Sequence, residues 1–107
     1  MNIKNCTPHA IVINDTTFQS SDILPRVSTK QVEAQDIAGF TCVTQSTGKV
    51  EGLPEPQENT FLIVSGMVFG VSDRLDLIAP DTGKTAIRNE KGHIVAVTQF
   101  LRKWYEN

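Results

Sequence analysis

Two segments of the chain place small or charged side chains directly beside apolar runs. Ser65 and Gly66 follow one such run, and a small pair at a strand-to-helix junction is typical of anion sites. Arg74 and Asp76 open the next run, where a guanidinium can grip an anion and a carboxylate can accept from a hydroxyl. Each pair also fits a structural role. Ser65 can cap a helix, Gly66 and Gly70 can let it pack tightly, and Arg74 and Asp76 can belong to a solvated turn.

A histidine and two further arginines complete the candidate set. His9 follows Thr7-Pro8 at the entrance of a predicted strand, where it could hydrogen-bond a ligand or act as a general acid or base. Arg26 and Arg88 stand beside apolar strands, and a cleft that gathered them with Arg74 would suit phosphates. No catalytic residue is assigned. The predicted ligand-binding residues are Ser65, Gly66, Arg74, Asp76, His9, Arg26 and Arg88.

Charge and hydropathy limit the classes of partner. The 107 residues include 10 lysines and arginines against 12 aspartates and glutamates, for a formal net charge of −2. Arg102-Lys103 is the longest basic run, which argues against neutralisation of a nucleic-acid backbone. No apolar stretch approaches the roughly 18 residues that a membrane-spanning helix needs. We therefore expect one domain that binds neither a nucleic-acid polymer nor a membrane.

The two cysteines are predicted to be free thiols. The first six residues contain no apolar segment of the kind found in signal peptides, so we expect a reducing, cytoplasmic setting for Cys6 and Cys42. Cys6 and His9 have the spacing of a zinc-binding pair, but Cys42 and His93 do not supply a second close pair. We expect no bound metal and no cofactor.

Two apolar runs in the middle of the chain organise the expected fold. Phe61 to Val64 and Leu75 to Ala79 are short and bounded by turn residues, as buried strands are. Between them, Met67, Val68 and Val71 have helical spacing and predict a short helix. Further strands are predicted at Ala10 to Ile13, Thr16 to Gln19, Arg26 to Glu33, Phe40 to Thr44, Ala86 to Arg88 and His93 to Phe100.

Glycine and small polar residues mark the ends of several of these strands. Ser46-Thr47-Gly48 is expected to end the strand at Phe40 to Thr44. Asn89 to Gly92 predicts a hairpin whose type I turn has a left-handed residue at Gly92. The second strand of this hairpin is apolar on both faces and is expected to be central. The C-terminal residues predict a helical turn. The side chains expected on one side of this turn are those of Phe100, Leu101, Trp104 and Tyr105.

The predicted fold class is α+β, with a single compact domain over residues 1–107. The expected sheet is mixed and mainly antiparallel, with roughly five to seven strands, one short central helix and a C-terminal helical turn. The aromatic pair Trp104-Tyr105 could cover the domain's own core or face another subunit. A small domain with an apolar tail favours a homo-oligomer.

Several motifs together resemble those of a family of small proteins encoded by bacteriophages and mobile elements. They are T-P-H-A-I near the start, D-R-L-D-L-I-A-P in the centre and R-N-E-K-G-H-I-V-A-V-T toward the end, and the resemblance covers most of the chain. It implies a phage or prophage setting in the cytoplasm of a bacterial host, and no particular activity. Small phage proteins include oligomeric binders that sequester the nucleotide second messengers of bacterial immunity, which gives an analogy for the ligand class.

Three functions from different classes fit the sequence. The first is a binder that captures an anionic, nucleotide-like ligand without chemistry, through the candidate residues above. The second is a phosphoester hydrolase or lyase with His9 as acid or base and arginines that stabilise charge. The third is a protein-binding inhibitor of a host factor, which would use the C-terminal aromatic pair or an edge strand. We favour the binder because a strand–glycine–helix junction lies beside Asp73-Arg74.

Overall fold

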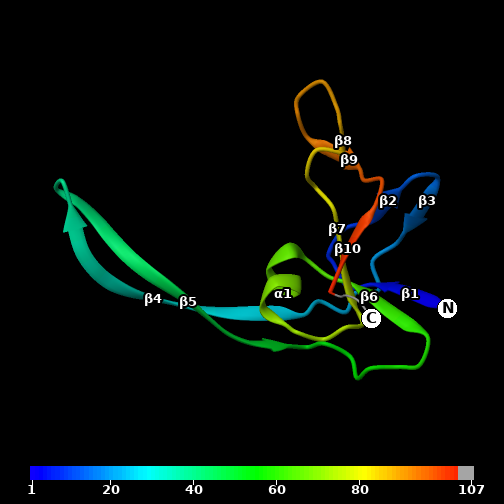
Figure 1. Ribbon diagram of the computed structural model, residues 1–107, viewed down its shortest axis with the longest axis horizontal. Helices are drawn as coiled ribbons and strands as arrows, with labels where there is room; N and C mark the ends of the chain where they lie inside the picture. The colour runs from blue at the N-terminus through cyan, green and yellow to red at the C-terminus, as the bar shows by residue number, and fades with distance from the viewer. Residues whose placement is uncertain (104–107) are drawn as a thin grey trace.

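The computed structural model describes residues 1–103, and its central feature is a four-stranded mixed sheet (Figure 1). In order across the sheet, the strands are β1 (Asn2–Asn5), β6 (Thr60–Ile63), β7 (Leu77–Pro80) and β10 (Phe100–Arg102). β1 and β6 are parallel, as are β6 and β7, whereas β10 runs antiparallel to β7. Two segments far apart in the chain, the N-terminus and the centre, therefore form one sheet.

The helix α1 (Gly66–Val71) joins β6 to β7, and the two apolar runs correctly predict this strand–helix–strand unit. Ser65 Oγ accepts a hydrogen bond from the Val68 N–H at 3.3 Å, which fixes the start of the helix. At the other end, the Ser72 N–H donates to the Val68 carbonyl at 3.0 Å. Val68 is buried, whereas Met67 is 53% exposed. The spacing therefore predicts the helix but not which of its residues enter the core.

The core lies between α1 and one face of the central sheet. Its buried members are Cys6, Leu62, Val64, Val68 and Leu77. Around them pack the partly buried side chains of Ile23, Val27, Val50, Leu53 and Phe69. Because neighbouring residues of a strand point to opposite faces, Ile63 and Ile78 are buried on the other side of the sheet.

A long hairpin projects from this body (Figure 1) and is termed the arm. It consists of β4 (Arg26–Ile37) and β5 (Phe40–Glu51), each of 12 residues. The φ angles of Ala38 and Gly39 at its tip are +51° and +84°, as a two-residue type I′ turn requires. The arm is therefore a two-stranded ribbon closed by a tight turn, with register shifts between Val27 and Thr29 and between Ala34 and Ile37.

The arm corrects the prediction for this part of the chain. The predicted strands ended at Glu33 and Thr44, but β4 and β5 stay paired over nearly their whole length. Ser46-Thr47-Gly48, expected to end a strand, lies inside β5. Phe40, which begins β5, is 74% exposed. Turn-forming residues can continue a solvated ribbon, since their side chains have no core to fill there.

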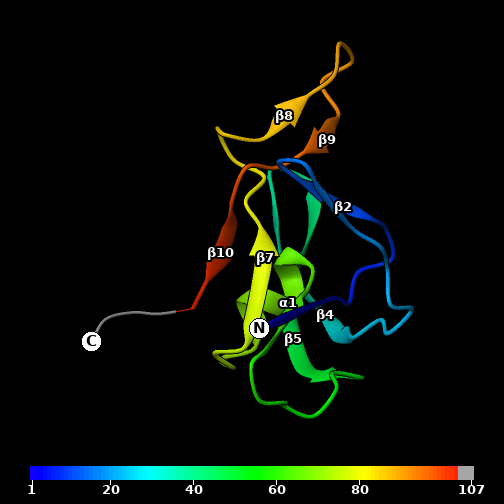
Figure 2. The same cartoon turned by 90° about the vertical axis from the view of Figure 1, so that its right-hand side faces the viewer.

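Two shorter hairpins flank the central sheet, and their strands lie within segments that the sequence predicts to be strands. β2 (Ile11–Ile13) pairs with β3 (Thr16–Phe18), and β8 (Ile87–Arg88) pairs with β9 (Ile94–Ala96) beyond the end of β7 (Figure 2). The predicted left-handed residue, Gly92, has φ of +83°, and its N–H donates to the Asn89 carbonyl at 2.9 Å. Turn chemistry thus predicts these connections correctly.

The predicted central strand from His93 to Phe100 is wrong. β9 ends at Ala96 in a two-stranded sheet, and a separate strand, β10, begins at Phe100 on the edge of the central sheet. Phe100–Arg102 is therefore extended rather than helical, while Trp104 and Tyr105 lie outside the described residues.

Mixed sheets with one short helix agree with the coarse α+β prediction, although strands dominate the fold. The expected single sheet is wrong, because the strands of residues 1–103 divide between the central sheet and three hairpins. No helix in this part of the chain is long and apolar enough to cross a membrane.

Candidate functional site

The motif around His9 forms a buried hydrogen-bond network. Asn5 Oδ1 accepts from the N–H and the hydroxyl of Thr7, at 3.0 and 2.6 Å. Asn5 Nδ2 donates to the carbonyls of His9 and Phe18, at 2.9 and 2.8 Å. Asn5 and Thr7 are buried, whereas His9 is exposed and contributes its backbone carbonyl to the network. The motif therefore connects the end of β1 to the β2–β3 hairpin.

Cys6 lies within the same buried region. Burial raises the pKa of its thiol above the usual value, while the hydroxyl of Ser21, 4.0 Å from Sγ, acts in the opposite direction. The Ser21 hydroxyl also donates to the Asn5 carbonyl at 2.8 Å, so the loop after β3 is held against this buried region. The Cys6 thiol is therefore protonated and enclosed at neutral pH. Within residues 1–103, no three His, Cys, Asp or Glu side chains gather as a metal site would need.

Arg74 and Asp76 bind each other. Arg74 Nε donates to Oδ1 of Asp76 at 2.9 Å, and Nη2 donates to Oδ2 at 2.6 Å. Arg74 Nη1 donates to the Pro54 carbonyl at 2.9 Å. The hydrogen bonds to Asp76 raise the pKa of Arg74 above its usual value, so the guanidinium stays charged. The pair ties the segment before β7 to the loop that follows the arm.

Ser65 and Gly66 form the start of a helix of only six residues. The Ser65 hydroxyl already accepts a hydrogen bond from the Val68 N–H. Ser65 is thus the helix cap that was the structural alternative to an anion site. The predicted tight packing at Gly66 and Gly70 is wrong, because a Cβ added at either glycine would meet no atom within 4 Å. The junction is therefore an exposed helix cap with open space around it.

The other two candidate arginines lie apart from Arg74. Arg26 begins β4 and pairs with Glu51 across the root of the arm. Arg88 ends β8, and its Nη1 donates to the Gly92 carbonyl at 2.8 Å. The seven predicted residues do not share one cleft, and of the seven only Arg74 and Asp76 are joined by side-chain hydrogen bonds.

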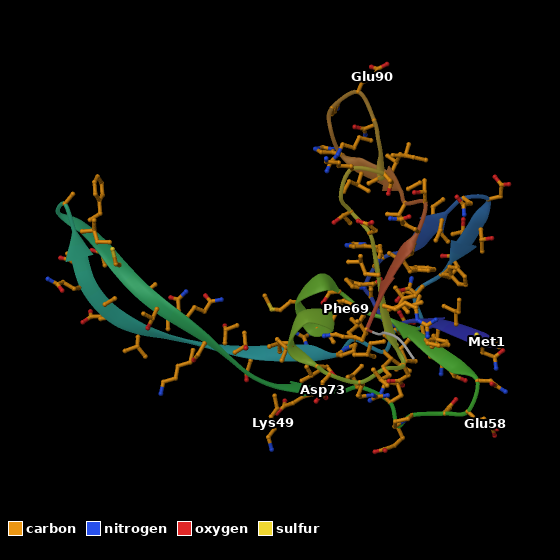
Figure 3. All side chains as sticks on the ribbon, in the orientation of Figure 1. Met1, Lys49, Glu58, Phe69, Asp73 and Glu90 are labelled. Carbon is orange, nitrogen blue, oxygen red and sulfur yellow. The ribbon has the colours of Figure 1, made fainter. Side chains whose placement is uncertain are left out.

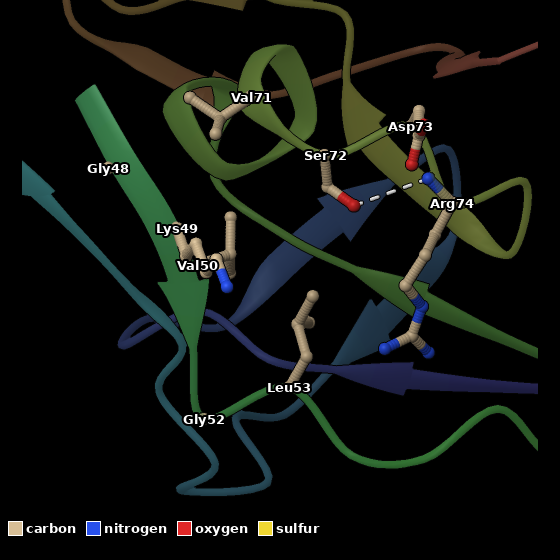
Figure 4. Close-up of a pocket in the computed structure, with 9 residues that line it drawn as sticks. All are labelled: Gly48, Lys49, Val50, Gly52, Leu53, Val71, Ser72, Asp73 and Arg74. Atoms are coloured by element: carbon tan, nitrogen blue, oxygen red, sulfur yellow. Dashed lines mark hydrogen bonds between the residues drawn. The ribbon is translucent and has the colours of Figure 1, made fainter. Parts of the chain in front are cut away.

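A cleft of about 630 Å³ opens where the arm meets α1 and is termed the root cleft (Figure 4). β5 and the loop after it form one wall, and the segment that follows α1 forms the other. Figure 3 places Lys49 and Asp73 at this junction. The residues that line the cleft are Gly48, Lys49, Val50, Gly52, Leu53, Val71, Ser72, Asp73 and Arg74.

The root cleft combines apolar side chains with two cations, Lys49 and Arg74, and one carboxylate, that of Asp73. Val50 and Leu53 lie across the hollow from Ser72 and Arg74 (Figure 4). A guanidinium has five N–H donors; Asp76 and Pro54 engage three of those of Arg74, which leaves two. Of the lining residues, only Arg74 is among the predicted ligand contacts. Lys49 follows Gly48 in a segment whose residue types do not indicate a binding site.

Comparison of the chain with protein-family models, with curated proteins and with solved structures finds no match to any of them. The resemblance to a phage-encoded family therefore stays a prediction. The root cleft is the place where the structure brings together charged, polar and apolar side chains.

Proposed function

We propose that the protein captures a small anionic, nucleotide-like ligand in the root cleft and carries out no chemistry on it. The cleft volume of about 630 Å³ lies within the range of roughly 300–1,000 Å³ that is typical of small-molecule sites. Val50, Leu53 and Val71 offer apolar surface to a base or sugar. Lys49 and Arg74 offer positive charge to a phosphate or carboxylate.

The observation that carries this proposal is the fixed position of the Arg74 guanidinium. Its bonds to Asp76 and to the Pro54 carbonyl hold it at the edge of the cleft before any ligand arrives. Little side-chain freedom is then lost on binding, which favours affinity. Asp76 offsets much of the Arg74 charge, whereas within residues 1–103 Lys49 has no salt-bridge partner. Lys49 therefore supplies most of the attraction for an anion.

Two other functions stand as alternatives. A phosphoester hydrolase or lyase with His9 as acid or base would need a second site, because His9 does not line the root cleft. An inhibitor of a host protein would instead use an exposed strand edge, such as those of β4 and β5. Ligand capture uses side chains that the structure brings to one place, and for that reason we prefer it.

Native mass spectrometry with linear and cyclic nucleotides, and with inorganic phosphate as the simplest anion, tests the proposal. We expect one nucleotide to be retained with its mass unchanged. Lys49→Ala should weaken its affinity roughly 10- to 100-fold, the effect of losing one charge-assisted hydrogen bond. Lys30→Ala removes the same charge from the arm outside the cleft and should leave the affinity unchanged.

Three results would contradict the proposal. A nucleotide that returns as a product would make the protein an enzyme. Retention of neither a nucleotide nor phosphate would remove the ligand assignment. Equal losses in the Lys49 and Lys30 variants would mean that general electrostatic attraction, rather than the root cleft, binds the anion.

A further inference from the structure

The arm gives the protein more surface than a compact monomer of its size has. The accessible surface is 7728 Å², whereas a compact monomer of 11.8 kDa exposes about 5,900 Å². The radius of gyration is 16.6 Å, against about 13 Å for a compact domain of this length. The excess surface is about 1,800 Å². Figure 1 shows the arm projecting from the rest of the fold, with the β8–β9 hairpin as a further projection.

One face of the arm is apolar. Paired residues of an antiparallel ribbon share a face, and so do alternate residues along β5. Val32 pairs with Thr44, Ala34 with Cys42 and Ile37 with Phe40. The apolar face of the arm therefore carries Val32, Ala34, Ile37, Phe40 and Cys42, together with the more polar Thr44. The largest of these side chains are the most open, with Phe40 74% and Ile37 69% exposed.

The other face of the arm is more polar. Glu33 pairs with Val43, and Gln31 pairs with Gln45, whose side-chain amides are joined by a 3.0 Å hydrogen bond. The ribbon is thus amphipathic, as a strand pair is when one side packs on a partner and the other faces water. Its apolar side has no partner within residues 1–103.

A solvated two-stranded ribbon is marginally stable by itself. Among the described residues of the arm, Val27 and Val50 at its root are the ones that pack against the core. Beyond the root, β4 and β5 pair only with each other, so each leaves one edge free. A partner that covered the apolar face would supply the missing stabilisation.

The charge of the arm indicates what kind of partner fits. It carries three basic and three acidic residues, namely Arg26, Lys30, Lys49, Glu33, Asp36 and Glu51, and so has no net charge. This balance fits neither a phosphate backbone nor an anionic membrane, both of which attract clusters of cations. A second copy of the arm would meet no net repulsion, and symmetric self-association is the commonest form of assembly.

We propose that the arm packs against a second copy of the chain and buries its apolar face in a homo-oligomeric interface. The excess surface sets an upper limit of about 3,600 Å² on what such an interface buries in total, above the roughly 1,600 Å² of a standard interface. This assembly is independent of the ligand proposed for the root cleft.

Sedimentation velocity over a series of protein concentrations tests the assembly. The wild-type protein should sediment as two or more copies. Val32→Ser should weaken self-association roughly 10-fold and Phe40→Ser about 100-fold, because each removes apolar area from the interface. Val43→Ser is the matched control, since Val43 is 49% and Val32 52% exposed but the two lie on opposite faces. It should leave the association unchanged.

Cys42 provides a second readout, because it lies on the apolar face. Its reaction with a maleimide should be slow in the wild-type protein at high concentration and fast in the Phe40→Ser variant. Cys6 is 3% exposed and should react slowly in both proteins. Circular dichroism checks that the variants fold, as expected for substitutions of exposed side chains.

The outcomes separate this proposal from its competitors. A wild-type protein that stays monomeric at every concentration would overturn it, and so would equal effects of Val32→Ser and Val43→Ser. A monomer that floats with neutral phospholipid vesicles would assign the apolar face to a membrane instead. None of these results changes the expected retention of a nucleotide, so the two proposals can fail separately.

Discussion

At the residue scale, Asn5 explains why the motif around His9 resembles a site without forming one. Its amide makes four hydrogen bonds, which use both of its N–H donors and both acceptor positions of its oxygen. Three of these connect Asn5 to Thr7 and His9 within one tight bend, and the fourth reaches Phe18 in β3. Polar residues grouped in this way form hydrogen bonds with one another, and their spacing stabilises the bend of the chain rather than a binding site.

Replacing Asn5 with alanine should lower the free energy of unfolding by about 2–4 kcal/mol, because the buried Thr7 N–H loses its acceptor and the Phe18 carbonyl loses a donor. The Thr7 hydroxyl can still donate to the His9 carbonyl. Urea denaturation followed by circular dichroism measures the change. His9→Ala is the control and should shift stability by no more than about 0.5 kcal/mol, since His9 is exposed. An Asn5→Ala protein as stable as the wild type would show that water can replace the amide.

Arg74 shows, at the same scale, how much of the candidate site could be predicted. Its type and its spacing from Asp76 correctly indicate a two-bond grip on a carboxylate, but the carboxylate belongs to the same chain. Lys49 could not be identified, because its place in the root cleft depends on β5 extending to Glu51. Where charged side chains converge is set by long-range pairing, which local residue patterns do not contain.

At the scale of elements, segments marked by apolar composition or by turn residues were predictable, whereas β1 and the full length of the arm were not. β6 and β7 are apolar on both faces because they are central and covered, so composition alone marks them. β1 is short and polar in sequence, and its hydrogen bonds come from β6, which lies far away in the chain. β4 and β5 are exposed over most of their length, and the register shift between Ala34 and Ile37 breaks the apolar alternation of β4, so the pattern that marks them is short.

The two turn residues of the arm, Ala38 and Gly39, allow its stability to be changed in either direction. Ala38 has φ of +51°, a conformation that asparagine tolerates better than alanine in type I′ turns. Ala38→Asn should therefore stabilise the arm by about 0.5–1 kcal/mol, which hydrogen exchange of the β4 and β5 amides would report as slower exchange. Gly39→Ala should have the opposite effect through backbone strain alone, because its Cβ would meet no atom within 4 Å. Shifts in the same direction would contradict the assigned turn.

At the scale of the whole molecule, the core that stabilises the fold and the exposed arm are separate parts of the chain. Among the described residues, the buried apolar side chains all lie outside the arm. The arm packs against them through Val27 and Val50 alone. The root cleft lies where these two parts meet. Removing the distal arm should therefore change assembly and shape while leaving the core intact.

A shortened chain tests this separation. Thr29 pairs with Thr47, so replacing residues 30–46 by Asn-Gly keeps a paired two-residue hairpin at the root. We expect this protein to fold, because Val27, Val50 and the root cleft are retained. It should be a monomer with a radius of gyration of about 12 Å by small-angle X-ray scattering. It should also keep any nucleotide that the full chain binds, since Lys30, the control position, is removed while Lys49 remains. Loss of folding would mean that the distal arm stabilises the body, and a persistent oligomer would place the interface elsewhere.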